Sequence, residues 1–405
     1  MNLSVHLLVF IHSYAFMKKS LFALLLGGLG IGTTEFVMMG LLPVIAGNLG
    51  ISIPQAGHLI SAYALGVVIG APLLVIFSGG VPPKRLLIIL MILFTVFNAL
   101  SGLALNYYSL FALRLLSGLP HGAFFGVGAV VASRLAEKGK EAQAISMMFA
   151  GLTIANLAGV PLGTFLGSHL SWRYTFLLIG LIGLATLLCL QLWMPALSAQ
   201  KKENISQQLT FFKSPESWLI ILLIAIGTGG LFCWISYISP LLTEVSRFSI
   251  DSVPYILAFA GLGMCAGNLL GGRLADRFSP ARTAFALLIA MSLSLALVTF
   301  VSEYKALSLV MTFITGLLAF ALAAPIQMLM IQSARGSEMF AAAVAQACFN
   351  IGNALGAYLG GLPLEAGYSY TSPEWVGVGM ALIGATAAAI LIQYRRNLMS
   401  EPIPS

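Results

Sequence analysis

Glu35 and Arg114 are charged residues that lie within long, otherwise apolar segments of the chain. Counted along a helix from Lys19, Glu35 lies about 24 Å from the inner membrane boundary. Arg114 lies at a similar depth, roughly 21 Å, in a hydrocarbon core about 30 Å thick. If their two helices line one cavity, the two side chains can form an intramembrane ion pair. Protonation of Glu35 would then release Arg114, so the pair is a candidate proton switch.

Two other interpretations of this pair stay open. The ion pair could serve only to fix helix packing, or Glu35 could lie near the outer mouth, where water solvates it. We favour the functional interpretation, because charges without a role are rare inside membranes. His121 follows Arg114 by seven residues and shares its helix face, so it is a candidate proton relay or substrate contact, with hydrogen-bonded packing as the alternative.

A polar stripe lies in the second half of the chain. Gln346, Asn350 and Asn353 are spaced by four and three residues, so their amides project from one helix face. Such a lining suits a neutral or mildly polar ligand, whereas the alternative is hydrogen bonding that holds helices together. For Trp234 we prefer core packing. The predicted substrate cavity comprises Met38, Tyr63, Asn156, Trp234, Tyr237, Gln327, Gln346, Asn350 and Asn353.

Composition determines which elements position these residues. Of the 405 residues, 59% are hydrophobic and 8% are charged, whereas soluble domains have roughly 25% charged residues. An ordinary soluble enzyme is therefore excluded, and the chain has room for about twelve apolar spans of roughly 20 residues each. We predict them near residues 20–42, 57–79, 84–104, 109–134, 142–167, 173–194, 217–240, 253–275, 283–301, 306–331, 340–362 and 374–394.

Residues 51–85 recur without a gap at residues 248–282. Each copy has a short polar turn, a glycine-spaced apolar helix, and a turn with proline and arginine. Repeats of this kind are typical of transporters, whose site lies where two related halves meet. We therefore predict an all-α membrane protein with twelve transmembrane helices in two pseudo-symmetric six-helix bundles. The expected parts are an extension at 1–17, a bundle at 18–196, a cytoplasmic linker at 197–216, a bundle at 217–394 and a tail at 395–405.

Glycines at four-residue spacing form three ridges in the predicted spans. Small residues let helix backbones approach closely, so we interpret these ridges as packing surfaces between helices that move during transport. Their members are Gly159, Gly163 and Gly167; Gly263, Gly267 and Gly271; and Gly352, Gly356 and Gly360.

Positive charge predicts the orientation, because Lys and Arg collect in cytoplasmic loops. Of the 20 basic residues, sixteen fall on the side of the predicted N-terminus, three fall on the other side, and Arg114 lies within a span. Both termini should therefore be cytoplasmic. The net charge of +7 follows from this pattern and gives no reason to expect a nucleic-acid partner. Because Met17 directly precedes Lys18 and Lys19, we expect Met17 to be the natural start.

No cofactor or metal site is expected. The four cysteines lie in predicted spans without a short-spaced pair, so they resemble apolar packing residues. The sequence has no Walker A loop, and its longest loop, 196–216, is too short for an ATPase domain. Any pumping must therefore use an ion gradient.

The motifs resemble those of the major facilitator superfamily, in its drug:proton antiporter and sugar efflux branch. GGRLADRF at 271–278 resembles the loop signature, whose first-half counterpart at 79–85 has Gly79 in place of the usual aspartate. RLLSGLPHGAFFGVGAVVA at 114–132 and ANLAGVPLGTFLG at 155–167 resemble the fourth- and fifth-span motifs. Nearly end to end, the chain is similar to the arabinose efflux permease group. The predicted gating loop residues are Arg85, Asp276, Arg277 and Arg282, with Asp276 and Arg277 forming a latch.

The resemblance implies a two-bundle transporter that exports small organic solutes in exchange for protons. Our leading hypothesis is a proton-coupled exporter of sugars or sugar-like and amphiphilic compounds. The runner-up is multidrug efflux, since pliable side chains such as Met38 accept many shapes. A non-transporting membrane sensor is the hypothesis from another class, whereas a membrane enzyme is not expected. The expected partners are a small-molecule substrate, protons and lipid. The expected location is a bacterial inner (plasma) membrane, and the expected state is a monomer.

Overall fold

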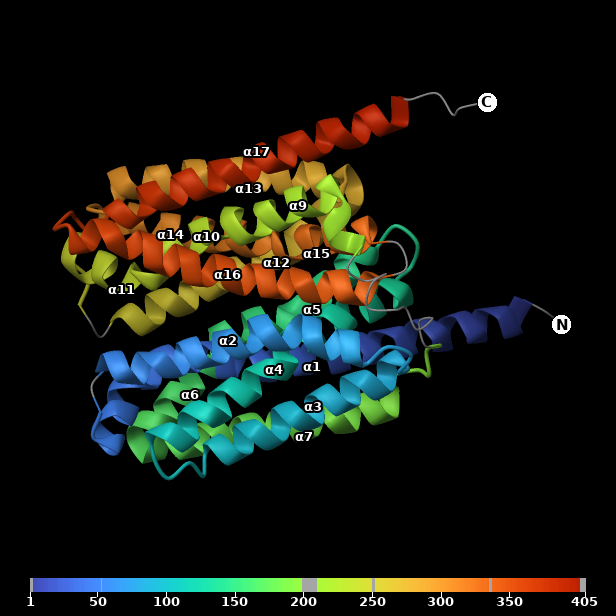
Figure 1. The fold of residues 1–405 in the computed structure, drawn as a ribbon, viewed down its shortest axis with the longest axis horizontal. Helices are drawn as coiled ribbons and strands as arrows, with labels where there is room; N and C mark the ends of the chain where they lie inside the picture. The colour runs from blue at the N-terminus through green and yellow to red at the C-terminus, as the bar shows by residue number, and fades with distance from the viewer. Residues whose placement is uncertain (1–2, 52, 199–209, 250–251, 335–336, 401–405) are drawn as a thin grey trace. The chain divides into compact units, whose positions relative to one another are not determined.

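The computed structural model consists of helices joined by short turns in the residues it describes, 3–51, 53–198, 210–249, 252–334 and 337–400. The chain divides into two compact units, Met1–Glu203 and Asn204–Ser405. The boundary lies within the predicted linker, of which residues 199–209 fall outside the described part. In Figure 1 the first unit runs from blue to green and the second from yellow-green to red.

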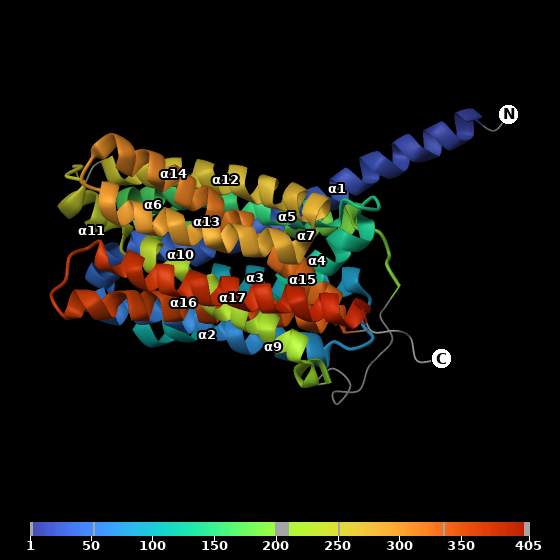
Figure 2. The same cartoon turned by 90° about the horizontal axis from the view of Figure 1, so that it is seen from above.

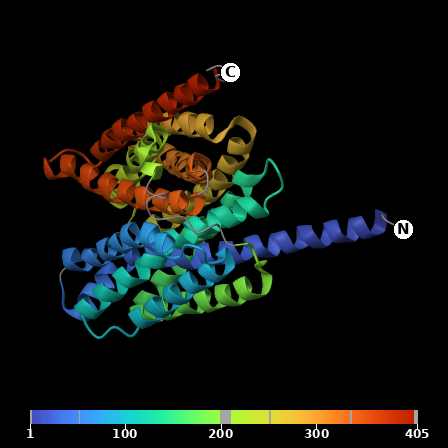
Figure 3. The ribbon, with the colours of Figure 1, turned by 45° about the vertical axis from the view of Figure 1, so that its right-hand side comes forward.

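The first unit begins with four long helices. Their bounds are α1 Leu3–Leu49, α2 Ile53–Phe77, α3 Pro83–Ser101 and α4 Tyr107–Leu135. The first of them is much longer than the predicted span at 20–42, because the predicted extension continues the helix (blue in Figures 2 and 3).

A nearly continuous helical stretch follows as the fifth and sixth spans. It comprises α5 Glu141–Ile154, the π-helix η1 Ala155–Gly159, α6 Val160–Leu166, the π-helix η2 Gly167–Ser171 and α7 Trp172–Trp193.

The second unit begins with a broken seventh span. After the 3-10 turn η3 Thr210–Lys213, it comprises α9 Pro215–Leu222, the π-helix η4 Leu223–Gly227, α10 Gly229–Ser236, α11 Ile238–Pro240 and the π-helix η5 Leu241–Val245. The remaining spans are α12 Val253–Phe278, α13 Pro280–Val301, α14 Lys305–Ala321 with α15 Ala323–Ser333, α16 Glu338–Glu365 and α17 Ser372–Ser400.

Eleven stretches of the described chain are long and apolar enough to cross a membrane. One of them, Glu141–Trp193, has 53 residues, which at about 1.5 Å per residue is more than twice the thickness of a bilayer core. Ser171 divides it, because its backbone is extended (φ −162°, ψ 139°) and its side chain caps α7. The stretch therefore supplies two spans, and each unit contains six membrane helices.

The repeat in the sequence corresponds to a repeat in the packing. In the first unit, a Cβ atom at Gly66 or Gly70 would fall against the carbonyl oxygen of Leu115 or Leu119 on α4. In the second unit, Gly263, Gly267 and Gly271 of α12 meet carbonyl oxygens of α14 in the same way, and α12 and α14 lie side by side (Figure 2). Helices α3 and α13 both begin at the proline of the repeated turn, Pro83 and Pro280.

The predicted glycine ridges of the fifth and eleventh spans are confirmed as packing surfaces. Gly159, Gly163 and Gly167 face Thr33, Val37 and Leu41 of α1. On α16, Gly352, Gly356 and Gly360 face Thr228, Gly229 and Cys233, in and just before α10. Each unit thus packs a glycine-spaced helix against its own first span, where bulkier side chains would separate the backbones.

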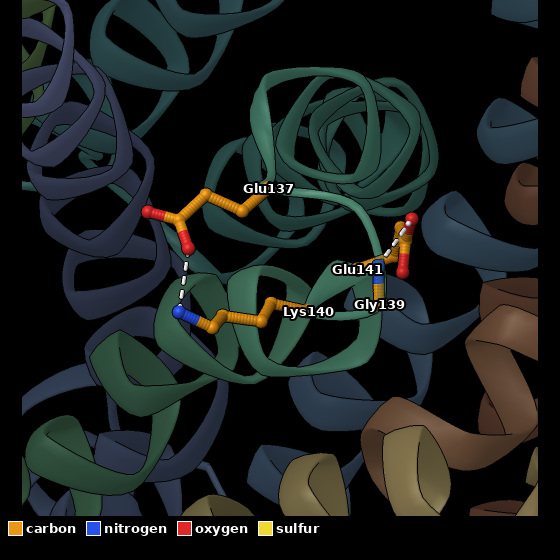
Figure 4. A network of polar contacts seen from close by, with 4 residues as sticks. All are labelled: Glu137, Gly139, Lys140 and Glu141. Carbon is orange, nitrogen blue, oxygen red and sulfur yellow. Dashed lines mark hydrogen bonds and ion pairs between the residues drawn. The ribbon is translucent and has the colours of Figure 1, made fainter. Parts of the chain in front are cut away.

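A tight turn joins α4 to α5 and is held by local polar contacts (Figure 4). Lys140 pairs with Glu137 at 2.5 Å, and the Gly139 amide donates to Glu141 Oε1 at 3.1 Å. Gly139 has a φ of +83°, a conformation that favours glycine.

The last helix extends beyond the predicted end of the twelfth span. Helix α17 continues to Ser400, so most of the predicted tail at 395–405 is helical where it is described. Arg395 of this extension forms an ion pair with Glu216 at 2.6 Å. The pair ties α17 to the start of α9, and both side chains are only partly exposed.

Candidate functional site

Arg114 lies at the centre of a buried polar cluster in the first unit. Its side chain is fully buried, and Nη1 donates a hydrogen bond of 2.8 Å to Thr34 Oγ1 of α1. The Thr34 hydroxyl in turn donates to Asn98 Oδ1 of α3 at 2.5 Å. The Asn98 amide is held by the Phe94 carbonyl at 2.9 Å. Three helices therefore meet at one chain of hydrogen bonds.

Two aromatic rings flank the Arg114 guanidinium. Its central carbon lies 4.3 Å from the ring centre of Tyr63 on α2 and 5.8 Å from that of Phe176 on α7. These contacts stabilise the cation through the ring quadrupoles, and more strongly in a site without water. Nε and Nη2 have no hydrogen-bond partner. The cluster thus holds the charge while leaving two strong donors unused.

Tyr63 connects Arg114 to His121. The Tyr63 hydroxyl and His121 Nδ1 share a hydrogen bond of 3.0 Å, and both side chains are buried. His121 also lies against the ring of Phe125 at 5.3 Å between centres. Predicted proton-coupling and cavity residues thus come together here, and His121 has the hydrogen bond that its packing interpretation requires.

Glu35 lies beside this cluster but does not form the expected ion pair. Both residues are described, and no nitrogen of Arg114 lies within the 4.0 Å of a Glu35 oxygen that an ion pair requires. Arg114 instead donates to Thr34, the residue before Glu35. The physical reason is the direction of the side chains around the helix axis. Adjacent residues on a helix point about 100° apart, so Thr34 can face Arg114 while Glu35, at nearly the same depth, points elsewhere. Glu35 is 8% exposed, which does not fit the open outer mouth considered as an alternative.

The amide stripe of the second unit forms hydrogen bonds within that unit. Gln346 Nε2 donates to Gln327 Oε1 at 2.9 Å, and Gln327 Nε2 donates to the Ala342 carbonyl at 3.0 Å. The Asn350 amide is held by the carbonyl of Gln346 on its own helix at 3.1 Å. All three side chains are buried. In this conformation they tie α15 to α16, as the packing interpretation predicts.

The other predicted cavity residues are distributed over both units. Trp234 is 1% exposed, which fits the preferred core-packing interpretation. The Tyr237 hydroxyl donates to the Ala357 carbonyl of α16 at 2.7 Å. Met38 is fully buried on α1, while Asn156 on η1 and Asn353 on α16 are half-buried. The Asn156 amide donates to the Leu152 carbonyl at 3.1 Å.

The predicted gating residues lie at helix ends next to the repeated turns. Arg85 is in the first turn of α3 and Arg282 in that of α13, and both are exposed. Arg277 lies 5.1 Å from the ring centre of Phe278. Asp276 is half-buried in the last turn of α12, just before Ser279 with its φ of +85°.

We predict that Asp276→Asn lowers turnover several-fold while surface expression is unchanged. The carboxylate is the acidic member of the proposed latch, and the amide keeps its shape but not its charge. Transport rate normalised to surface protein measures the effect. Arg277→Gln should act in the same direction, and full turnover in both variants would contradict a latch at this turn.

Three residues of the Arg114 cluster were missing from the sequence-based site: Thr34, Asn98 and Phe176. Thr34 is adjacent to Glu35, and Asn98 is the amide of the apolar third span, so both carried a detectable signal. An amide within an apolar helix needs a partner, which here is Thr34. Phe176 carried no signal, because one phenylalanine in an apolar span is ordinary.

A family model and known proteins match this chain along most of its length. Residues 24–343 and 255–404 match the family model described as the Major Facilitator Superfamily. The chain belongs to the Major Facilitator Superfamily. It is 43% identical over 380 residues to the putative transporter AraJ of Escherichia coli (strain K12), covering 94% of this chain and 96% of that protein. It is 31% identical over 373 residues to the probable sugar efflux transporter of Helicobacter pylori (strain G27), covering 91% and 94%.

Solved structures of the Major Facilitator Superfamily have the same fold. The E. coli fucose:proton symporter FucP superposes with a TM-score of 0.72 at 14% identity, covering 91% of this chain and 98% of that one. The proton:xylose symporter XylE gives 0.72 at 16%, covering 94% and 96%. As a member of this superfamily the chain is a multi-pass membrane transporter, not an enzyme or a non-transporting sensor.

Proposed function

We propose that this transporter exports small organic solutes, sugars or sugar-like and amphiphilic compounds, in exchange for protons. The observation that carries the proposal is the buried cluster of Arg114, Thr34, Asn98, Tyr63 and His121 beside Glu35. A membrane protein keeps a buried acid and a buried base near one another at a large desolvation cost, which a coupling role explains.

The cluster gives Arg114 two alternative partners. In the present conformation the guanidinium is held by Thr34, and Nε and Nη2 are unused. Glu35 directly follows Thr34, the present partner of the guanidinium, on α1. We infer that the deprotonated carboxylate attracts these free donors, while the protonated carboxyl leaves the arginine on Thr34. The conformation described here then represents the proton-loaded state.

The aromatic rings around the cluster and the name of one relative support the proposed substrate class. Aromatic rings surround the cluster: Tyr63 and Phe176 flank Arg114, and Phe125 stacks on Phe149 at 5.0 Å between centres. Aromatic faces bind both sugar C–H surfaces and amphiphilic rings. A relative at 31% identity is named as a probable sugar efflux transporter, which favours sugars.

The proposed orientation has both termini in the cytoplasm. It rests on the excess of Lys and Arg in loops on that side of the predicted spans. A relative at 38% identity is named as an inner membrane transport protein of E. coli, and we place this chain in a bacterial inner membrane accordingly. Each unit packs around its own core, so a monomer suffices for alternating access.

We predict that Glu35→Gln abolishes proton movement coupled to substrate. The amide keeps the shape of the carboxyl but cannot exchange a proton. Purified protein in liposomes would be exposed to arabinose, related sugars and a panel of cationic drugs, with internal pH as the readout. Glu303→Gln, at an exposed carboxyl, is the matched control and should retain coupling.

The screen also separates the candidate substrates. A response to sugars that is lost in Glu35→Gln supports the proposal, whereas a response only to cationic drugs supports the runner-up, multidrug efflux. Fully coupled transport in Glu35→Gln would refute Glu35 as the coupling carboxyl. Substrate-driven proton movement in the same direction as the substrate would refute exchange.

A further inference from the structure

Glu374 is a second buried carboxyl, located in the first turn of α17. Its side chain is 0% exposed, and neither Oε1 nor Oε2 has a hydrogen-bond partner. Ser372 Oγ, two residues earlier, is likewise buried without a partner. A buried carboxylate with no partner is very unfavourable, so a group in this position holds a proton as long as it remains enclosed.

The sequence around Glu374 suggests a helix-capping role for its carboxyl, but the structure does not show this capping bond. Thr371-Ser372-Pro373-Glu374 has the spacing of a capping box, in which the glutamate accepts from the backbone amide three residues earlier. Here the Thr371 amide donates instead to Ser369 Oγ at 3.4 Å, so the bond that a capping box would give Glu374 is absent. Helix capping therefore does not explain why a carboxyl is buried at this position.

The corresponding turn of the first unit shows how such a charge can be satisfied. There Arg173, in the first turn of α7, lies two residues after Ser171, just as Glu374 lies two residues after Ser372. Arg173 donates to Asn48 Oδ1 at 2.9 Å and to the Ala104 carbonyl at 3.0 Å, and it lies 4.3 Å from a ring centre of Trp172. Arg173 is thus fixed by three contacts, whereas neither carboxyl oxygen of Glu374 has a comparable hydrogen-bond partner.

Small residues on α17 and α10 bring the backbones together around Glu374. A Cβ atom at Gly377, one turn along α17, would approach the Gly230 carbonyl oxygen to 2.9 Å and Cys233 Cβ to 3.3 Å. On the side of α13, the ring of Phe300 contacts that of Trp375 at 5.9 Å between centres. Access of water to Glu374 therefore requires a separation of α17 from α10 or α13 within the second unit.

Few other titratable groups on the helices packed against α17 come near Glu374. The Cys233 thiol of α10 is within electrostatic reach of the carboxyl and donates to Met380 Sδ at 3.7 Å. Arg282 lies in the first turn of α13, about 27 Å along that helix from Phe300. Glu338 is the first residue of α16. Glu216 of α9 is paired with Arg395, about 31 Å along α17. Among the remaining groups, Glu303 lies in the exposed turn after α13, Lys305 begins α14, and Cys348, Tyr358 and Glu365 belong to α16.

We propose that Glu374 is a second proton-binding site, loaded and emptied at its own end of the C-terminal unit when α17 and α10 separate. The helix N-terminus at α17 stabilises the anion once water enters, because free amides and the helix dipole favour negative charge there. While the Glu374 carboxyl is enclosed, its protonated form is favoured. When α17 and α10 separate and water enters, release of the proton is favoured. This inference rests on the proposed proton coupling and adds a second carboxyl to it.

The decisive measurement reads the proton on Glu374 directly. Infrared difference spectra of the full chain in lipid nanodiscs, between acidic and alkaline pH, report the C=O stretch of protonated carboxyls. We expect Glu374→Gln to remove one pH-dependent carboxyl band that Glu35→Gln and the control Glu303→Gln retain. A spectrum unchanged by Glu374→Gln would overturn the proposal, even if Glu35→Gln abolishes coupled transport.

A second measurement uses the unaltered chain, in case Glu374→Gln does not fold. A hydrophobic carbodiimide adds to protonated carboxyls in apolar surroundings, and mass spectrometry of the peptide that contains Glu374 gives the extent of labelling. We expect labelling to fall severalfold from acidic to alkaline pH. Labelling that is absent or equal at every pH shows that no exchangeable proton resides there and overturns the proposal.

Discussion

Arg114→Leu is expected to reduce coupled transport at least about tenfold without lowering thermal stability. The lost hydrogen bond from a charged donor corresponds to about 1.5–3 kcal/mol, and tenfold corresponds to about 1.4 kcal/mol. The arginine is fully buried with two donors unpaired, so its burial carries a desolvation cost that leucine does not, and this offsets the lost hydrogen bond in the free energy of unfolding. Liposome transport and the midpoint of thermal unfolding measure the two effects separately.

Two further variants refine the test of Arg114. Arg114→Lys keeps the charge but loses the planar fork that reaches Thr34 and stacks on Tyr63, so partial activity is expected. Arg396→Gln, at an exposed arginine near the end of α17, should leave transport unchanged. A loss of folding in both Arg114 variants would instead assign the residue to helix packing.

Gly267→Ala is expected to destabilise the second unit by about 1–3 kcal/mol, the usual cost of overpacking a close contact. The added methyl group would fall against the Leu317 carbonyl oxygen, where neighbouring backbone cannot move aside. At about 2–4 °C per kcal/mol for a domain of this size, the midpoint of thermal unfolding should fall by several degrees. Transport should fall with it, since α12 and α14 can no longer approach.

The control for this substitution is Gly379→Ala on α17. No atom lies within 4 Å of a Cβ atom at Gly379, so the methyl group meets open space. Alanine has a higher helix propensity than glycine by about 1 kcal/mol, and this variant should be as stable as the wild type or slightly more stable. Equal effects of the two substitutions would show that the close approach at Gly267 is unimportant.

The fold could be predicted from the sequence because its signals repeat. Gly66 and Gly263, and likewise Gly70 and Gly267, occupy matching positions in the sequence repeat and make matching close approaches in the structure. The prolines that begin α3 and α13 also match. Span ends were harder to predict, because α1 and α17 continue as helices beyond their apolar segments, where hydropathy gives no stop signal.

The site could be predicted only in part, because depth along a helix is readable and rotation about its axis is not. Glu35 and Arg114 were placed at one level, and Arg114 does reach α1 there, but its partner is Thr34. Choosing between adjacent residues requires the orientation of both helices, which no single sequence supplies. Glu374 was overlooked because it lies at the first residue of the predicted twelfth span, where an acid looks like an ordinary loop residue.

The π-helical turns η1 and η2 in the fifth span and η4 and η5 in the seventh span give these helices an unusual kind of freedom. Each wide turn accommodates a surplus residue, with hydrogen bonds from i to i+5. As such a turn moves one residue along a helix, the side chain that it passes rotates by about 100° around the axis, while the number of backbone hydrogen bonds is conserved. At these turns the spans can therefore exchange the side chains on a given face by a local screw-like rotation.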